Sequence, residues 1–239
     1  MSLSNLFACE KKIYSQNGED GVIEAIFAAI GVTNKYVVEF GCGDGLECNS
    51  ANLMNQGWSG LHMDGFCQSQ NPLIKIQKEF INADNIQFLF LKYQVPEHFD
   101  LLSIDIDGND FWVWKQILQR PRVVISEYNA NLPPHLSRTI FYDPNFMWKG
   151  TDYFGASLLA LKKLGELKGY TLVYCENTGA NAFFIANEAL PGDFVPRPIE
   201  EIYRPPNYLG KGKRWRSDPM FQMIDPFQPL DFFSQIDVL

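Results

Sequence analysis

The sequence predicts a doubly wound α/β fold built on one seven-stranded, mostly parallel sheet whose last strand is antiparallel. Short apolar runs alternate with stretches of helical periodicity, and a glycine cluster follows the first of these runs. The last two runs are separated only by a turn-length link. With 239 residues, 46% of them hydrophobic, the chain is long enough for one sizeable core. We expect one domain over residues 1–190 and an extension over 191–239.

The first part of the chain is expected to hold two helices and two strands. Apolar residues three and four apart predict a helix over 22–30, which Gly31 ends. A run rich in β-branched and aromatic residues then predicts a buried strand. The expected elements after the first helix are a strand at 36–40, a helix at 49–56 and a strand at 60–64.

The middle of the chain continues this alternation. Strands that are separated by helices form parallel βαβ units. The expected elements are a helix at 72–80, a strand at 86–91, a strand at 99–106, a helix at 111–118 and a strand at 122–127.

A long polar, proline-bearing segment over 129–154 follows and is too long for an ordinary connection. We expect it to be a lid or a substrate loop. A helix at 156–168 and strands at 170–175 and 181–186 come next. The short turn over 176–180 requires those two strands to be antiparallel.

From Pro191 onward, prolines interrupt any helix or central strand. Aromatic residues are frequent in the same segment and would favour aggregation if they were left in water. We expect them to pack on the domain or on a second subunit, which would make a homo-oligomer. These aromatics include Tyr203, Trp215, Phe221, Phe227, Phe232 and Phe233.

The net charge of −8 gives no overall cationic field, so no nucleic-acid partner is expected. A dense basic stretch at Lys211, Lys213, Arg214 and Arg216 has the character of a solvated loop. The first residues lack the features of a signal peptide, and no apolar run is long enough to span a bilayer, which predicts a cytoplasmic protein with no membrane partner. Five scattered cysteines predict free thiols.

A nucleoside-shaped site is predicted where the first two strands end. Glu39 lies near the end of the first strand, and Gly41, Gly43 and Gly45 alternate in the turn behind it. Small residues allow a ligand to approach the backbone at the carboxyl edge of the sheet. The second strand ends in Asp64, which can accept hydrogen bonds from both hydroxyls of a ribose.

This segment resembles motif I of the class I S-adenosylmethionine-dependent methyltransferases, an acidic strand residue followed by GxGxG. The resemblance implies a Rossmann-like methyltransferase fold. It also implies that Glu39 lies at the amino-acid end of the methyl donor, that Gly41 and Gly43 contact its backbone and that Asp64 binds its ribose. A nicotinamide-binding GxGxxG motif would need a glycine where Leu46 stands, so the spacing favours the methyl donor.

A second group of acidic residues ends the strands of the middle region. Asp105 and Asp107 project from the same face if the strand continues, and Glu127 ends the next strand. Like charges this close need a cation or a shared proton. An oxygen-rich cluster suits Mg²⁺, Mn²⁺ or Ca²⁺. The alternatives are that Asp107 or Asp110 caps the next helix, or that backbone donors satisfy the carboxylates.

The same region is similar to the FkbM-like methyltransferases, whose pattern is Asp, apolar, acid, Gly, any, acid, then a strand ending in Glu. Asp107 and Asp110 stand at two places where that group usually has glutamate, so both side chains are shorter here. The matching residues are Asp105, Asp107, Gly108, Asp110 and Glu127.

An N-terminal segment, Tyr-Ser-Gln-Asn-Gly-Glu-Asp-Gly, also resembles a segment of related proteins that lies beside the donor pocket. The resemblance implies that Gln16, Asp20 and Asp105 belong to the cofactor site. It covers residues 13–187 and does not reach the proline-rich extension.

The expected reaction is therefore O-methylation of a sugar or another small-metabolite hydroxyl, with S-adenosylmethionine as donor. The acceptor proton has to be removed. Asp107, Asp105 or His135 in the long loop are the candidates, whereas His62 and His98 have structural positions. Two alternatives stay open: a nicotinamide-dependent oxidoreductase, and a non-catalytic S-adenosylmethionine-binding or assembly protein.

Overall fold

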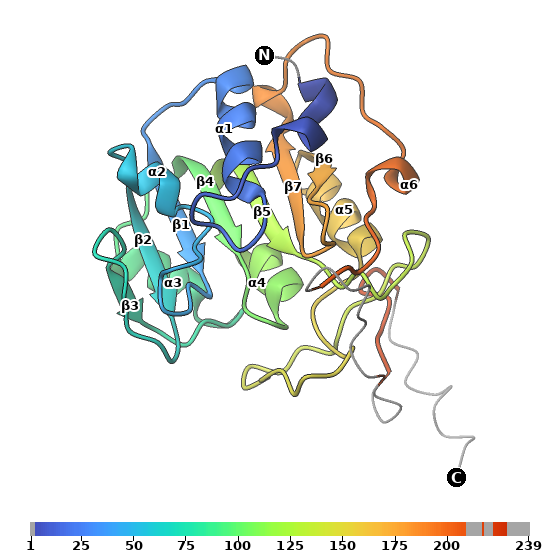
Figure 1. The fold of residues 1–239 in the computed structure, drawn as a ribbon. Coiled ribbons are helices and arrows are strands. Elements are labelled where there is room, and N and C mark those ends of the chain that lie inside the picture. The colour runs from blue at the N-terminus through green and yellow to red at the C-terminus, as the bar shows by residue number, and fades with distance from the viewer. Residues whose placement is uncertain (1–2, 209–216, 218–221, 229–239) are drawn as a thin grey trace, which may run out of the picture.

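The computed structural model describes residues 3–208, 217 and 222–228, and it shows a central sheet with helices on both sides (Figure 1). Within these residues the strands are β1 Tyr36–Phe40, β2 Ser59–Asp64, β3 Ile76–Lys78, β4 His98–Ile104, β5 Arg120–Glu127, β6 Tyr170–Cys175 and β7 Asn181–Ala186.

The strands form one sheet in the order β3-β2-β1-β4-β5-β7-β6. The pairs among β1 to β5 are all parallel. Only β7 runs against its neighbours, because it pairs antiparallel with both β5 and β6. The predicted fold class, a mostly parallel seven-stranded sheet with an antiparallel last strand, is confirmed.

Helices cover the two faces of the sheet in two groups. The helices are η1 Leu3–Cys9, α1 Glu19–Ile30, α2 Ala51–Asn55, α3 Ile86–Lys92, α4 Asp110–Gln116, α5 Leu158–Leu167, η2 Asn187–Ala189 and α6 Ile199–Ile202. Apolar residues of α3, α4 and α5 share one buried cluster, and those of η1, α1 and α2 share another. In the described part of the chain, no helix is long and apolar enough to cross a membrane.

Successive apolar side chains of the central strands belong alternately to the two clusters. Val37 and Leu101 belong to the cluster under α1, whereas their neighbours Val38 and Leu102 belong to the cluster under α4 and α5. Successive side chains of a strand point to opposite faces, so a strand with apolar residues at every position is buried on both sides. Each such side chain contributes about 1.5 to 3 kcal/mol through burial.

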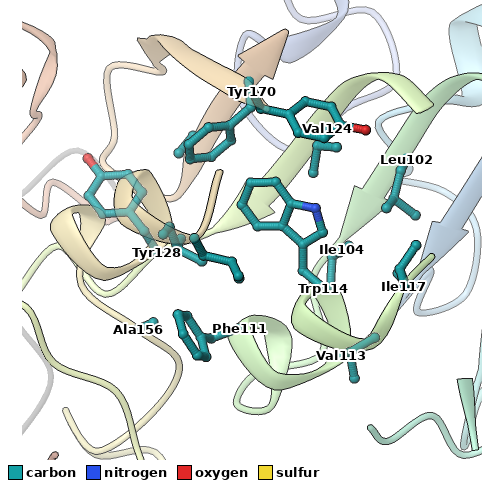
Figure 2. Close-up of a cluster of buried hydrophobic side chains, with 14 of the residues drawn as sticks. Leu102, Ile104, Phe111, Val113, Trp114, Ile117, Val124, Tyr128, Ala156 and Tyr170 are labelled. Atoms are coloured by element: carbon teal, nitrogen blue, oxygen red, sulfur yellow. The ribbon is translucent and has the colours of Figure 1, made fainter. Parts of the chain in front are cut away.

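Trp114 anchors α4 in the larger cluster, as the close-up in Figure 2 shows. Its ring lies 4.8 Å from the ring of Phe184 and 5.9 Å from that of Tyr170, measured between centroids. Only 1% of Trp114 is exposed. Because α4 begins at Asp110, this packing fixes the position of the acidic turn that precedes the helix.

The strand expected at 86–91 is wrong, because these residues form α3. The apolar run hides a helical pattern: Ile86, Leu89 and Phe90 are buried, whereas Phe88 and Leu91 are exposed. A short apolar run fits a strand or a helix equally well from sequence.

Side chains of two asparagines organise the turn before α3. Asn82 Oδ1 accepts hydrogen bonds from the N–H groups of Asp84 and Asn85, and Asn85 Oδ1 accepts one from the N–H of Asn82. Such local bonds favour the start of a helix.

The helix expected at 72–80 is also wrong. The structure places β3 there, with Ile76 opposite His62 in a parallel pair at the edge of the sheet. The strand is only three residues long, and short edge strands carry little sequence signal. The remaining predicted elements are present; three strands, 36–40, 170–175 and 181–186, have the predicted bounds, and the ends of the others are shifted by a few residues.

The segment 129–154 connects β5 to α5 and contains neither a helix nor a strand. Asn129 holds it in place, since its side-chain amide donates to the carbonyl oxygens of Asp152 at 2.7 Å and Phe154 at 3.0 Å. The side chain of Trp112 donates to the carbonyl oxygen of Ile140 at 3.0 Å. The loop is therefore docked on the domain.

The described part of the extension packs on the domain of the same chain. Ile202 of α6 is 2% exposed, and Tyr203 donates from its hydroxyl to the carbonyl oxygen of Ala130 at 2.7 Å. The ring of Phe227 lies 5.9 Å from that of Phe111. The other residues named in the extension lie outside the described residues: Trp215, Phe221, Phe232, Phe233, Lys211, Lys213, Arg214 and Arg216.

Candidate functional site

A cavity of about 990 Å³ lies at the carboxyl ends of β1, β2, β4 and β5. This is the edge at which open α/β sheets bind ligands. The loop 129–154 contributes to its wall. Seven of the predicted site residues line it: Gln16, Gly41, Gly43, Asp64, Asp105, Asp107 and Glu127.

The glycine turn after β1 is shaped by a close backbone approach. Gly41 has φ +70°, and a β-carbon built on it would lie 1.4 Å from the carbonyl oxygen of Asp105. No side chain is possible there without moving β4. Gly43 also has positive φ, at +52°, and its N–H donates to Asp64 Oδ2 at 3.0 Å. The turn thus presents bare backbone to the cavity.

Asp64 ends β2 and organises the loop behind it. Its Oδ1 accepts hydrogen bonds from the N–H groups of Phe66 at 2.7 Å and Cys67 at 2.8 Å. With the bond from Gly43, three donors occupy a carboxylate that has about four acceptor positions. About one acceptor position is left on this carboxylate, and Asp64 lines the cavity.

Two aromatic residues beside Asp64 were not predicted as part of the site. Phe66 and Phe80 line the cavity, their ring centroids are 5.9 Å apart, and they are 63% and 38% exposed. Ile81 lines the same wall. Phe66 comes two residues after Asp64, the last residue of β2. This position close to the strand end is the one feature of the sequence that indicates a place for Phe66 in the site.

Glu39 lies behind the cavity wall. Its carboxylate accepts hydrogen bonds from the N–H groups of Asn49 at 2.8 Å and Ser50 at 3.0 Å, and from the Ser50 hydroxyl. The Ser50 hydroxyl also lies 2.8 Å from Nε2 of His62. Burial raises the pKa of the Glu39 carboxyl, while these hydrogen bonds oppose the rise.

Asp20 holds the N-terminal segment against the domain. Its Oδ2 accepts hydrogen bonds from the N–H groups of Ile13, Tyr14 and Ser15 at 2.7 to 2.8 Å. Gln16 follows directly and lines the cavity. Asp20 therefore fixes the backbone that precedes Gln16 without lining the cavity itself.

The three acidic residues of the second group come together. Asp105, Asp107 and Glu127 each offer a carboxylate oxygen, and these oxygens lie within 4.8 Å of one another. Asp107 has a left-handed backbone conformation with φ +56°, which is costly for a residue other than glycine and is most common at functional sites. Glu127 Oε2 is buried and has no hydrogen-bond partner.

Mutual repulsion and burial make this cluster electrostatically unfavourable. Burial, and then the charges of Asp107 and Asp110, raise the pKa of Asp105 well above its ordinary value. Burial, and then Asp105 and Asp110, do the same for Glu127. A cation or a bound proton would relieve both.

Asp110 has a different role from its neighbours. Its carboxylate accepts hydrogen bonds at 2.9 Å from the N–H groups of Ile106 and Gly108, so it closes the turn that carries Asp107. Burial raises the pKa of Asp110 to about 6, against these bonds. The alternative in which backbone donors satisfy a carboxylate therefore describes Asp110.

Four residues of the predicted site, all in the described part of the chain, are not in the cavity lining: Asp20, Glu39, Gly45 and His135. Gly45 packs on the next loop, where Asn71 donates to its carbonyl oxygen at 2.9 Å. His135 is exposed on the long loop.

The long loop contributes aromatic residues that the sequence did not single out. Phe146, Trp148 and Phe154 line the same cavity as the acidic cluster. Phe146 packs against Gly108, where an added β-carbon would lie 2.3 Å from its ring. Asn109 donates from its side-chain amide to the carbonyl oxygen of Asp143 at 2.8 Å. The loop and the acidic turn thus form one wall.

No protein-family model matches this chain, and no curated protein matches it in sequence. Among solved structures, the chain is similar to the crystal structure of a SAM dependent methyltransferase from Aquifex aeolicus. The TM-score is 0.33 and the sequence identity 8%, over 78% of this chain and 99% of that one. Similarity at this level does not carry an activity from one chain to the other.

Proposed function

We propose that this protein is an S-adenosylmethionine-dependent methyltransferase that binds its donor between the glycine turn and Asp64. One observation carries the proposal: the N–H of Gly43 donates to Asp64 Oδ2, which joins the glycine turn and the acid proposed to bind the ribose in one cavity. The next features of the cavity are matched to the ribose and the adenine ring of the donor.

The adenosine part of the donor fits the wall around Asp64. The remaining acceptor capacity of this carboxylate suits a ribose hydroxyl. Phe66, Phe80 and Ile81 offer an apolar surface for the adenine ring. The cavity of about 990 Å³ is at the upper end for small-molecule sites, so it has room for a donor and an acceptor together.

The geometry of the turn disfavours the nicotinamide alternative. Dinucleotide sites place the pyrophosphate at the N-terminus of a helix that follows the glycine turn directly. Here α2 begins only at Ala51 and is five residues long. Leu46 stands where the third glycine would be. The turn therefore suits a donor that has no phosphate.

The acidic cluster is proposed as the place of the acceptor, with Mg²⁺ or Mn²⁺ held by Asp105, Asp107 and Glu127. The oxygen-only donor set and the unpartnered Glu127 Oε2 fit such an ion. When bound, the ion would polarise the acceptor oxygen. In this proposal Asp107 takes the hydroxyl proton as this oxygen accepts the methyl group from sulfur, which leaves a neutral thioether.

A sugar or another small hydroxylated metabolite is the proposed acceptor. Aromatic side chains at Phe146, Trp148 and Phe154 offer flat apolar surfaces, and the carboxylates of the same cavity can accept hydrogen bonds from hydroxyl groups. The acidic lining disfavours a strongly anionic acceptor.

Titration calorimetry with S-adenosylhomocysteine tests the proposed function, and NAD is the comparison ligand. We expect the wild-type protein to bind the first and not the second. Asp64→Ala should weaken binding by on the order of 1 to 3 kcal/mol, because a charge-assisted hydrogen bond is lost. Asp64→Asn, which keeps the shape, should lose less.

Transfer of a radiolabelled methyl group to hydroxylated small molecules then separates the remaining alternatives. Preference for NAD would favour the oxidoreductase. Donor binding without transfer to any acceptor would favour the non-catalytic binding protein.

A further inference from the structure

We infer that Lys12 binds the carboxylate at the amino-acid end of the methyl donor. This inference rests on the proposed function, and it names a residue that neither the motif nor the acidic cluster contains. Lys12 lines the cavity beside the glycine turn.

The charges of the cavity wall single out this lysine. Among the described residues that line the cavity, Lys12 is the only lysine or arginine. The lining carboxylates are Glu47, Asp64, Asp105, Asp107 and Glu127. These suit the sulfonium and the ammonium of the donor but would repel its carboxylate. The carboxylate therefore needs a cationic partner in an acidic wall.

The glycine N–H groups of the turn do not supply the missing donor. The N–H of Gly41 donates to the carbonyl oxygen of Met63 at 3.0 Å, and that of Gly43 donates to Asp64 at 3.0 Å. The N–H of Gly45 donates to the carbonyl oxygen of Cys42 at 2.8 Å. These three groups are already engaged in holding the turn, and Lys12 is the cationic side chain of the described lining that can receive the carboxylate.

The backbone that carries Lys12 is anchored next to the site. Directly after Lys12, the N–H groups of Ile13 and Tyr14 donate to Asp20 at 2.8 and 2.7 Å. Lys12 Nζ lies 2.9 Å from the carbonyl oxygen of Gln16 and 3.2 Å from Glu47 Oε1. The ammonium group thus bridges the N-terminal segment and the loop that continues the glycine turn.

The present partner of Lys12 is easily exchanged. The side chains of Lys12 and Glu47 are 52% and 58% exposed, and such exposed pairs contribute little to stability. Binding can therefore replace the Glu47 contact at small cost.

Two ligands that differ only at the amino-acid end test this inference by calorimetry. S-Adenosylhomocysteine has the carboxylate, whereas 5′-methylthioadenosine lacks the whole amino-acid end. Lys12→Met should weaken the binding of S-adenosylhomocysteine by about tenfold to a hundredfold, because a charge-assisted bond is lost. Its affinity for 5′-methylthioadenosine should stay unchanged, and Lys12→Arg should restore most of the loss.

Lys11→Met is the matched control, since it removes the same charge from an exposed neighbouring residue that is not in the lining. It should change neither affinity. Equal loss for both ligands in Lys12→Met, or no loss for either, would overturn the role of Lys12 while donor binding stands. If the wild-type protein binds neither ligand, the proposed function itself fails, and this inference fails with it.

Discussion

The backbone N–H of Gly43 donates a 3.0 Å hydrogen bond to Asp64 Oδ2, and this bond ties the turn after β1 to the end of β2. Two features that lie far apart in the sequence thereby become one surface. Asp64 also fixes the loop that carries Phe66, so a single carboxylate orders the ribose and adenine sides of the proposed donor site.

Gly41→Ala should destabilise the protein. The added β-carbon would meet the carbonyl oxygen of Asp105 at 1.4 Å, and φ is +70°. Left-handed strain and overpacking together should cost roughly 2 to 5 kcal/mol in urea unfolding. Gly150→Ala is the control, because φ there is +73° but the space is open, so only about 1 kcal/mol is expected. Equal losses would show that the approach of Asp105 is not the limiting contact.

Asp107→Asn should lower turnover by roughly a hundredfold or more while donor affinity stays nearly intact. The exchange keeps the size of the side chain and removes the charge that is proposed to take the acceptor proton. Steady-state rates and calorimetry on the same preparation give both values. Full activity in the variant would exclude an essential role for Asp107.

Removal of divalent cations should abolish most of the activity, and Mg²⁺ or Mn²⁺ should restore it. Binding of Mn²⁺, followed by electron paramagnetic resonance, gives a readout that does not depend on turnover. Glu127→Gln should weaken this binding, since it replaces a charged ligand whose Oε2 has no other partner. Activity that is insensitive to EDTA, with no Mn²⁺ binding, would restrict the cluster to proton transfer and acceptor binding.

His62 should make the stability of the protein depend on pH. Burial lowers its pKa from 6.5 to about 4, so the folded protein binds fewer protons than the unfolded chain between these values. Stability from this group is therefore complete above pH 6.5 and is lost as the pH falls. Relative to His62→Asn, the wild-type protein should lose roughly 2 kcal/mol between pH 7 and pH 5. Parallel pH profiles of the two proteins in urea unfolding would contradict this.

Ile202→Ala should destabilise the domain, because Ile202 is 2% exposed and its truncation leaves a cavity where the extension packs. The expected loss is about 2 to 5 kcal/mol. Val195→Ala in the same extension is the control, since Val195 is 77% exposed and should change stability by no more than about 0.5 kcal/mol. Equal small effects would mean that this extension adds little to the fold.

Long or strongly patterned segments made most of the fold predictable. The strands at 36–40, 170–175 and 181–186 have the expected bounds. The run from Ile86 to Leu91 predicts a strand but forms a helix. Its residues are apolar almost throughout, so the sequence does not show which of them a helix would bury. β3 was missed because three residues at a sheet edge give no periodicity.

The site was predictable where its chemistry follows strand ends. Asp64, Asp105, Asp107 and Glu127 line one cavity because the carboxyl ends of parallel strands meet at one edge. Lys12 and Phe146 reach the same cavity through loop contacts that have no fixed spacing in the sequence. The resemblance puts Glu39 at the amino-acid end of the donor, but the structure keeps Glu39 out of the cavity lining, where its carboxylate accepts hydrogen bonds from Asn49 and Ser50.

A crystal structure with S-adenosylhomocysteine tests whether the donor binds between the glycine turn and Asp64. We expect a ribose hydroxyl to lie within hydrogen-bond distance of the Asp64 carboxylate, the adenine to pack on Phe66, and the backbone of Gly41 and Gly43 to contact the amino-acid end. A ligand bound elsewhere, or a nucleoside whose ribose does not reach Asp64, would contradict this expectation.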